Sequence, residues 1–423
     1  MMYKNLLMLF FALVGLSLHA QDFPFRLFST VDAKGKTNIV ISPLSGQLAI
    51  SILVEGTSGQ ARQQLLDVMG YSTDADAQTA GRTWMNTLPG LDGSVVFEPA
   101  NSVWANTGIR VKEPFRQTLQ DAYRAEVLHA DLTTAEGLKQ LDGWVSDKTH
   151  GRIPSLDIQA NPDMRLVLVN TLYLKAPFTY CFNESYTKPG TFHNADGSKV
   201  GVQMMNQLGH FSYAHMEEYG FDVVEMPLGE EGFYDEKKQN YSMVFFLPQE
   251  RQSSLSEDVW THYQEALKRN VYVELSLPKF SIGYEMNMRE ILSEMGVTDI
   301  FDGADLSRIS DDAMGVNQMR QKSVLGIDEQ GVEGASATYV EVNSGLPGQK
   351  CSMTFDRPFY FAVRERTTGA VLFMGHVVAL EGTDGISTPT LQKTPSARFG
   401  LDGRRSDNTS HGIVIEDGKK VLR

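Results

Sequence analysis

Residues 165–175 read RLVLVNTLYLK, and apolar side chains occupy both the odd and the even positions of this segment. A β-strand places alternate side chains on opposite faces. A strand with one face in water would therefore alternate between apolar and polar residues, and this segment does not. The pattern predicts a strand that is buried on both faces, inside a sheet that is covered on both sides.

The order of the remaining elements predicts the fold class. Helix signals come mostly from the first part of the chain, and strand signals dominate from residue 196 onward. We expect strands at 39–41, 101–107, 221–228, 241–248, 271–284 and 322–328, a closing hairpin that turns at 367–369, and helices near 43–56, 60–69, 138–150 and 285–295. Early helices and late strands are typical of an α+β fold with large antiparallel sheets.

The N-terminal residues 1–20 have the pattern of a secretory signal peptide. Lys4 precedes an apolar run from Leu6 to Leu18, and we expect cleavage after Ala20. The run is too short to span a bilayer comfortably, and a buried core helix is the alternative interpretation. We therefore expect an exported, soluble protein that is secreted to the periplasm, the extracellular space or the cell surface.

Charge and cysteine content exclude several classes of partner. The chain of 423 residues has 52 acidic and 38 basic residues, a formal net charge of −14. Nucleic-acid binding normally needs a basic face, so we expect no nucleic-acid partner, and without a Lys/Arg run we expect no anionic membrane partner. Cys181 and Cys351 are the only cysteines. An exported protein permits a disulfide between them, and the sequence leaves open whether they pair.

No constellation of catalytic residues is visible. The histidines lack paired metal-ligand spacing, so no metal site is expected. The GTSGQ segment at 56–60 lacks the spacing of a nucleophile elbow and reads as a turn that ends a helix. Glu217 and Glu218 lie in a polar segment and are expected to be solvated. We expect neither a cofactor nor enzymatic activity, and a hydrolase is the least favoured interpretation.

Residues 330–345 are small, β-branched or acidic at almost every position. The two alternating sets are Val332, Gly334, Ser336, Thr338, Val340 and Val342, and Glu333, Ala335, Ala337, Tyr339 and Glu341. Both charges fall in the second set, so a strand here would present one uncharged face. Gly, Ala and Ser are poor strand formers, and the turn-rich NSGLPG follows. The segment is able to join a sheet without being committed to one; an edge strand plus loop is the alternative.

The surrounding motifs give this stretch a specific interpretation. DEQGVEGASATYVEV, residues 328–342, resembles the hinge of the serpins, the serine protease inhibitor family. NIVISPLSGQLAISILVEGTSGQA and LVNTLYLKAPF resemble two further serpin segments, and WVSDKTHGRIPSL, the stretch at 277–310 and FDRPFYFAVRERTTGAVLFMGHV match three more. In family order, these motifs cover about residues 25–380.

The resemblance implies a fold and a mechanism. The fold would be one domain, residues 21–380, with three sheets, about eight or nine helices and an exposed reactive centre loop. A target protease would cleave this loop near 343–348 and form a covalent acyl-enzyme. Residues 330–343 would then insert into the central sheet as a new strand and distort the protease. We expect a monomer; the alternative is a non-inhibitory protein of the same fold that binds a ligand or partner.

The resemblance also assigns roles to individual residues. The hinge would comprise Glu329, Gly331, Val332, Glu333, Gly334, Ala335, Ser336, Ala337 and Thr338. The cluster that the family calls the shutter would comprise Ser42, Ser45, Asn170 and Gln321, and the breach Phe178, Lys279 and Glu329. Gln321 stands where the family has a histidine, and Phe178 where it has a tryptophan. Glu329 is expected to pair with Lys279 and hold the upper end of the sheet.

The position of the reactive bond is open between two counts. Counting from Glu329 places the bait residue at Gly345, followed by Leu346, whereas counting back from Pro358 places it near Pro347. No basic residue lies between Glu341 and Gln349, which disfavours a trypsin-like target. The preferred targets are elastase-like serine proteases and papain-like cysteine proteases.

Residues 381–423 are expected to form a linker and a C-terminal tail. The segment from Thr394 resembles the sorting tails of secreted Bacteroidetes proteins, through LDGRR and GIVIEDGKKV. The run from Gly412 to Glu416, followed by Asp417-Gly418, fits a small hairpin. A disordered polar tail is the alternative.

Overall fold

The computed structural model of the chain describes residues 22–34, 37–229, 240–250, 253–301, 303–312, 315–316, 319–332 and 351–382, together with the backbone of short strands at 391–393, 399–400, 413–416 and 419–422. The expected signal peptide, the hinge beyond Val332 and both candidate reactive bonds lie outside the described residues. The α-helices of the described part are α2 (Phe23–Asp32), α3 (Pro43–Gly56), α4 (Gly59–Met69), α5 (Asp74–Thr87), α6 (Glu113–Tyr123), α7 (Ala135–Lys148), α8 (Glu257–Ala266) and α9 (Met288–Glu294).

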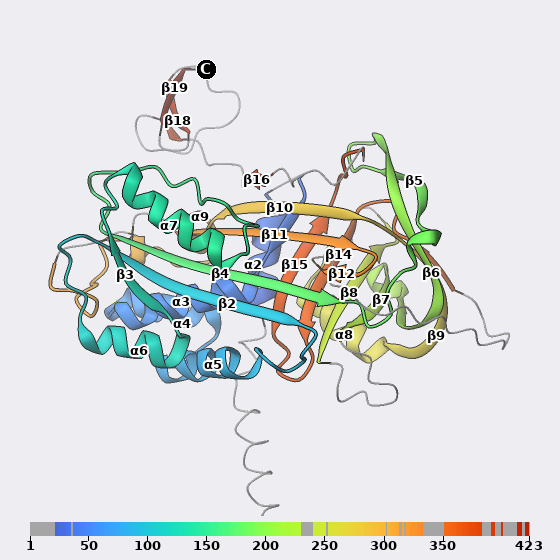
Figure 1. Cartoon of the computed structure of the whole chain (residues 1–423), viewed down its shortest axis with the longest axis horizontal. Coiled ribbons are helices and arrows are strands. Elements are labelled where there is room, and N and C mark those ends of the chain that lie inside the picture. The colour runs from blue at the N-terminus through green and yellow to red at the C-terminus, as the bar shows by residue number, and fades with distance from the viewer. Residues whose placement is uncertain are drawn as a thin grey trace, which may run out of the picture.

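Two large sheets form the framework (Figure 1). The seven-stranded sheet has the order β16 (Leu391–Lys393), β10 (Phe280–Asn287), β11 (Arg320–Asp328), β12 (Gly331–Val332), β4 (Leu166–Pro177), β2 (Val96–Asn106) and β3 (Glu126–Ala130). The nine-stranded sheet has the order β1 (Ile39–Ile41), β15 (Val371–Val377), β14 (Phe359–Glu365), β8 (Tyr241–Pro248), β7 (Phe221–Leu228), β6 (Lys199–Met216), β9 (Lys268–Pro278) and β13 (Cys351–Thr354), and β5 (Lys188–His193) pairs with β6. Early helices and late strands are confirmed.

Strand β4 is covered on both faces, as its sequence predicts. Val167 and Val169 belong to a hydrophobic cluster under α7, whereas Leu166 and Leu174, of the opposite parity, belong to the main core between the sheets and the helices. Figure 1 shows α7 lying across the seven-stranded sheet on one side, with α3 on the other. The two consecutive residues of intermediate burial, Leu172 and Tyr173, line a pocket.

Four helices were not predicted from the sequence: α2, α5, α6 and α8. The α5 helix shows the reason, since its buried residues are Ala77, Ala80, Gly81 and Met85, which give only a weak apolar period. A start signal was nevertheless present. The Thr73 hydroxyl accepts from the Asp76 backbone N–H, and the Asp76 carboxylate accepts from the Thr73 backbone N–H, which is a reciprocal capping box.

Some predicted boundaries were wrong, and one tail prediction has a counterpart in the structure. The strand expected at 271–284 is two strands, β9 and β10, because the chain passes from the nine-stranded sheet to the seven-stranded sheet at Lys279. The helix expected at 285–295 starts only at Met288, because Glu285–Asn287 continue β10 and pair with Lys322–Arg320 of β11. In the tail, β18 (Ile413–Glu416) pairs antiparallel with β19 (Lys419–Leu422), and β17 (Phe399–Gly400) joins them in a small third sheet. Among the described residues, no helix is long and apolar enough to cross a membrane.

Candidate functional site

A short strand begins between β4 and β11 and stops after two residues. β11 ends at Asp328, the chain reverses, and β12 then pairs with β11 on one side and β4 on the other. Gly331 makes the reversal possible: its φ is +136°, and a Cβ there would lie 2.4 Å from the carbonyl oxygen of Ala176. Val332 follows with its side chain only 1% exposed. Gly331 and Val332, two residues of the expected hinge, are therefore already part of the sheet.

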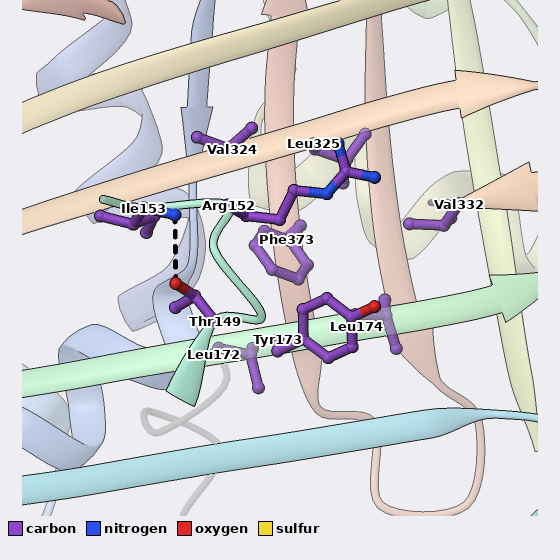
Figure 2. Close-up of a pocket in the computed structure, with 10 residues that line it drawn as sticks. All are labelled: Thr149, Arg152, Ile153, Leu172, Tyr173, Leu174, Val324, Leu325, Val332 and Phe373. Atoms are coloured by element: carbon purple, nitrogen blue, oxygen red, sulfur yellow. Dashed lines mark hydrogen bonds between the residues drawn. The ribbon is translucent and has the colours of Figure 1, made fainter. Parts of the chain in front are cut away.

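Beyond Val332, in the direction in which β12 runs, the space between β4 and β11 is a pocket rather than a strand (Figure 2). Its walls are Leu172, Tyr173 and Leu174 of β4, Val324 and Leu325 of β11, Phe373 of β15, Val332, and Thr149, Arg152 and Ile153 from the segment after α7. The lining is mainly apolar. A strand that continued β12 in the same direction would enter this space.

The segment after α7 forms a strap over this pocket; we use the name for residues 149–157. On the β4 side, His150 Nε2 lies 2.7 Å from Glu98 Oε2 of β2, and its ring centroid lies 4.3 Å from that of Tyr173. On the β11 side, Lys322 Nζ donates to the Ser155 carbonyl at 2.7 Å and lies 3.3 Å from Asp157 Oδ2. Adjacent strands lie about 4.8 Å apart, so a strand inserted between β4 and β11 would hold these two strands about 9.6 Å apart. Insertion would therefore disturb one or both attachments.

Glu329, at the reversal above β12, is held by three groups. Its side chain is 5% exposed, and Lys279 Nζ lies 2.5 Å from its Oε2. Thr187 Oγ1 donates to its Oε1 at 2.6 Å, and the Phe182 backbone N–H donates to its carbonyl at 3.0 Å. Burial raises the pKa of Glu329, but the hydrogen bonds from Lys279 and Thr187 outweigh burial and hold the pKa below its ordinary value. The carboxylate is therefore charged at neutral pH.

Phe178 lies beside the same reversal. Its backbone N–H donates to the Gln330 carbonyl at 2.8 Å, and its fully buried ring packs edge-on against Phe182 with centroids 5.8 Å apart. Cys181 Sγ donates to the Phe178 carbonyl at 3.3 Å. Burial raises the pKa of this thiol to about 11, so it is protonated and a poor nucleophile at neutral pH. Both cysteines are free, and Cys351 does not pair with Cys181.

The four expected shutter residues do not form a single hydrogen-bonded group. The Gln321 amide donates to the Ser42 carbonyl at 2.8 Å and accepts from the Ser42 N–H at 3.1 Å. Ser42 caps α3 and accepts from the Ser45 N–H at 3.2 Å. Asn170 instead donates to Asn101 of β2, which donates to the Tyr123 carbonyl at 2.9 Å. Within the described residues, no hydrogen bond links Asn170 to the other three, and its Oδ1 has no hydrogen-bond partner.

Sequence reasoning missed several members of the site. Thr187 contacts Glu329 from 142 positions away, and Asn101 and Lys322 carry no motif of their own. Asn101 was open to detection, because it is a polar residue within a strand of largely apolar and small residues. In the described part of the chain, no three His, Cys, Asp or Glu side chains cluster as metal ligands. The arrangement is one that can accept a strand.

Comparisons with known proteins agree with this geometry. The family model Serpin (serine protease inhibitor) matches residues 18–380. The chain is 30% identical over 378 residues to Alpha-1-antiproteinase of Rattus norvegicus, covering 86% of this chain and 89% of that protein. It is 28% identical over 352 residues to Serine protease inhibitor 42Dd of Drosophila melanogaster, covering 81% of this chain and 91% of that protein.

Solved structures share the fold. Human thyroxine-binding globulin complexed with its ligand superposes with a TM-score of 0.78 at 23% identity, covering 87% of this chain and 99% of that one. The thermophilic serpin tengpin in its native state superposes with a TM-score of 0.75 at 25% identity, covering 86% of this chain and 93% of that one. The α+β serpin fold that the motifs imply is confirmed. The chain belongs to the serpin family.

Proposed function

We propose that the protein is a secreted protease inhibitor that traps its target by inserting its own cleaved loop as a strand between β4 and β11. The observation that carries the proposal is β12: Gly331 and Val332 already pair with both neighbours, and the pocket below them lies in the path of the following residues. Insertion would extend a strand that has already started, so its first step is complete before cleavage.

The chemistry of the proposed reaction belongs to the protease. Its serine hydroxyl or cysteine thiol would attack the carbonyl carbon of Gly345, or of Pro347 by the alternative count. The peptide C–N bond would break, the following residue would leave as a free amine that takes up the proton, and the ester or thioester would join the two proteins. The inhibitor contributes the bait and the sheet, and the inserted strand stops water from completing hydrolysis.

The driving force for insertion would come from backbone hydrogen bonds that form only when the loop joins the sheet. Each backbone hydrogen bond contributes about 1 kcal/mol net, and the dozen or so residues after Val332 would also bury their uncharged faces. The total is on the order of 10 kcal/mol, comparable with the stability of a whole domain. The uncleaved form would then be kinetically trapped. Small residues at 334–338 suit insertion, because a charged group there would carry a large desolvation cost.

The remaining assignments are proposals of the same kind. The target is an elastase-like serine protease or a papain-like cysteine protease. The inhibitor would act as a monomer outside the cell, after residues 1–20 have been removed. Residues 381–423 would act as a linker and sorting tail. The pairing of β18 with β19 supports a folded element at the end of the tail.

The test is to incubate the protein with a panel of elastase-like, papain-like and trypsin-like proteases and to run denaturing gels. We expect an SDS-stable complex with at least one of the first two classes and none when the protease nucleophile is blocked beforehand. Cleavage at 343–348 without any complex would overturn the proposal, and it is the result expected of a non-inhibitory binding protein of this fold.

A further inference from the structure

The C-terminal tail supplies an edge strand to the seven-stranded sheet. Strand β16, residues 391–393, pairs in parallel with Gly283, Tyr284 and Glu285 of β10. Figure 1 shows β16 beside β10, at the opposite edge of the sheet from β3. The match to the serpin family model stops at residue 380, so β16 lies outside the serpin domain. Its contact with β10 is a feature that this chain adds to the fold.

Without β16, the outer edge of β10 would lack the devices that usually protect an edge strand, which are Lys, Pro, β-bulges and short length. β10 has the sequence FSIGYEMN, and its eight residues pair with β11 without a register shift. Its one charged side chain, Glu285, is 3% exposed, and its Oε1 lies 2.6 Å from Arg320 Nη1. The edge is long, regular and without an exposed charge, which is the pattern of an edge that associates with other strands.

The strand at the opposite edge of the sheet is protected differently. β3 is only five residues long and carries the exposed Glu126. Lys148 Nζ of α7 lies 2.9 Å from Glu126 Oε1, so a helix also contacts this edge. Short length, charge and a covering helix protect β3, whereas β10 depends on a segment from the tail.

We propose that β16 is a removable guard, and that its departure opens the β10 edge to the β10 strand of a second copy of the chain. Identical strands pair antiparallel across a two-fold axis, which makes the contact self-complementary and closed. A second copy fits because it brings a strand of the same length, the same regularity and the same lack of exposed charge. Loss or displacement of the tail would convert a monomer into a dimer whose two sheets are continuous through β10.

The length of the tether explains why the intact chain stays monomeric. Eight residues, 383–390, separate β16 from Gly382 at the end of the described serpin domain. A short tether gives the attached strand an effective concentration in the millimolar range, whereas a second copy is present at micromolar concentration. At equal affinity, β16 would therefore outcompete a strand from another molecule by about a hundredfold to a thousandfold.

The test keeps the full chain and changes only β16. Leu391→Pro and Gln392→Pro are made separately, because the N–H groups of neighbouring strand residues point to opposite sides and one of the two points at β10. Leu391→Val and Gln392→Thr keep both N–H groups and are the matched controls. Sedimentation over a series of protein concentrations gives the apparent dimer dissociation constant. Hydrogen exchange at the lowest concentration shows whether the amides of residues 283–285 lose protection.

We expect one proline variant to lower the apparent dimer dissociation constant about tenfold to a hundredfold, because each backbone hydrogen bond shifts an equilibrium about fivefold and the three-residue pairing makes a few of them. The controls should match the parent. Adding Ser281→Lys to that variant places a charge on β10 outside the β16 pairing, and it should restore the monomer.

Equal sedimentation of the parent and both proline variants, or unchanged exchange at 283–285 in both, would overturn the proposal. Association that Ser281→Lys leaves unchanged would overturn the assignment to β10, and assemblies larger than a dimer would overturn the two-fold arrangement. None of these measurements uses a protease. A failure of trapping therefore leaves this test intact, and a failure here leaves the proposed inhibitory function standing.

Discussion

Replacing Val332 with arginine is expected to convert the inhibitor into a substrate. Val332 is 1% exposed and lies between Ile327 of β11 and Ala176 of β4, at the top of the pocket that the strand must fill. An arginine there loses about 1.5 kcal/mol of apolar burial, and its guanidinium adds several kcal/mol of desolvation cost because no carboxylate lies opposite it. The inserted state is thus raised by roughly 4 kcal/mol or more.

The size of this free-energy cost matters because insertion of the loop competes kinetically with hydrolysis of the acyl-enzyme. Before cleavage the variant can hold its hinge outside the sheet, so attack on the loop should proceed at the parent rate. If a quarter to a half of the 4 kcal/mol appears in the barrier to insertion, insertion slows about fivefold to thirtyfold. Most attacks should then end as cleaved chain and free protease.

Denaturing gels at a series of inhibitor-to-protease ratios measure this partition directly. Val332→Thr keeps the shape without a charge and should lose much less complex, and Val96→Arg places the same charge on an exposed position. A Val332→Arg variant that yields as much complex as the parent would refute insertion through this position. A variant that is not attacked at all would show that the residue governs recognition of the loop instead.

Three further predictions concern the same end of the sheet. Glu329→Gln should lower the free energy of unfolding by about 2 kcal/mol at pH 7 and promote polymers on mild heating; monomers throughout would contradict it. The pKa of Glu329 is lower in the folded state than in the unfolded state. The pair with Lys279 therefore stabilises the folded protein fully above the unfolded-state pKa, and this stabilisation is lost as the pH falls through the folded-state pKa. Urea titrations of the parent and the variant should give the same stability in acid and differ fully at pH 7. Gly331→Ala should cost about 1–3 kcal/mol of stability in the same titration, since its Cβ would lie 2.4 Å from the Ala176 carbonyl at a φ of +136°; an unchanged midpoint would show that the backbone relaxes freely. Glu98→Gln weakens the half-exposed contact between Glu98 and His150 of the strap, which is worth at most about 1 kcal/mol. Complex formation should therefore accelerate by no more than about fivefold, and a slower rate would mean that the strap assists insertion.

The sequence predicted the framework well where local pattern and tertiary burial agree. The segment at 165–175 is apolar at both parities because α7 covers one face of β4 and the main core covers the other. The sequence-based prediction was wrong where strand pairing overrides the local preference for a helix. Glu285–Asn287 precede a helical sequence, yet they extend β10 because β11 offers a matching edge.

The candidate site was predictable as a set of residues but not as a gap. Motif resemblance placed Gly331, Val332 and Glu329 at the hinge, and the chain reversal brings them together through local geometry. The pocket walls come from four distant parts of the chain, around residues 150, 173, 325 and 373. No periodicity in the sequence indicates that a strand is missing between two parallel neighbours. The contribution of Thr187 is similarly invisible, because a hydroxyl in a turn is usually solvated.

The glutamine at 321 changes how this sheet can respond to pH. A histidine at this position would gain or lose a proton near neutrality, whereas the Gln321 amide donates to and accepts from the Ser42 backbone without any charge. These two bonds keep their strength at every pH at which the chain stays folded. Any pH dependence of sheet opening must therefore arise elsewhere, and at the upper end of the gap the buried carboxylate of Glu329 supplies it only in acid. Gln321→His should consequently make the rate of complex formation depend on pH near neutrality, a dependence that residue 321 of the parent does not provide. Identical pH profiles for the two proteins would mean that the pairing of residue 321 with Ser42 does not limit the opening of the sheet.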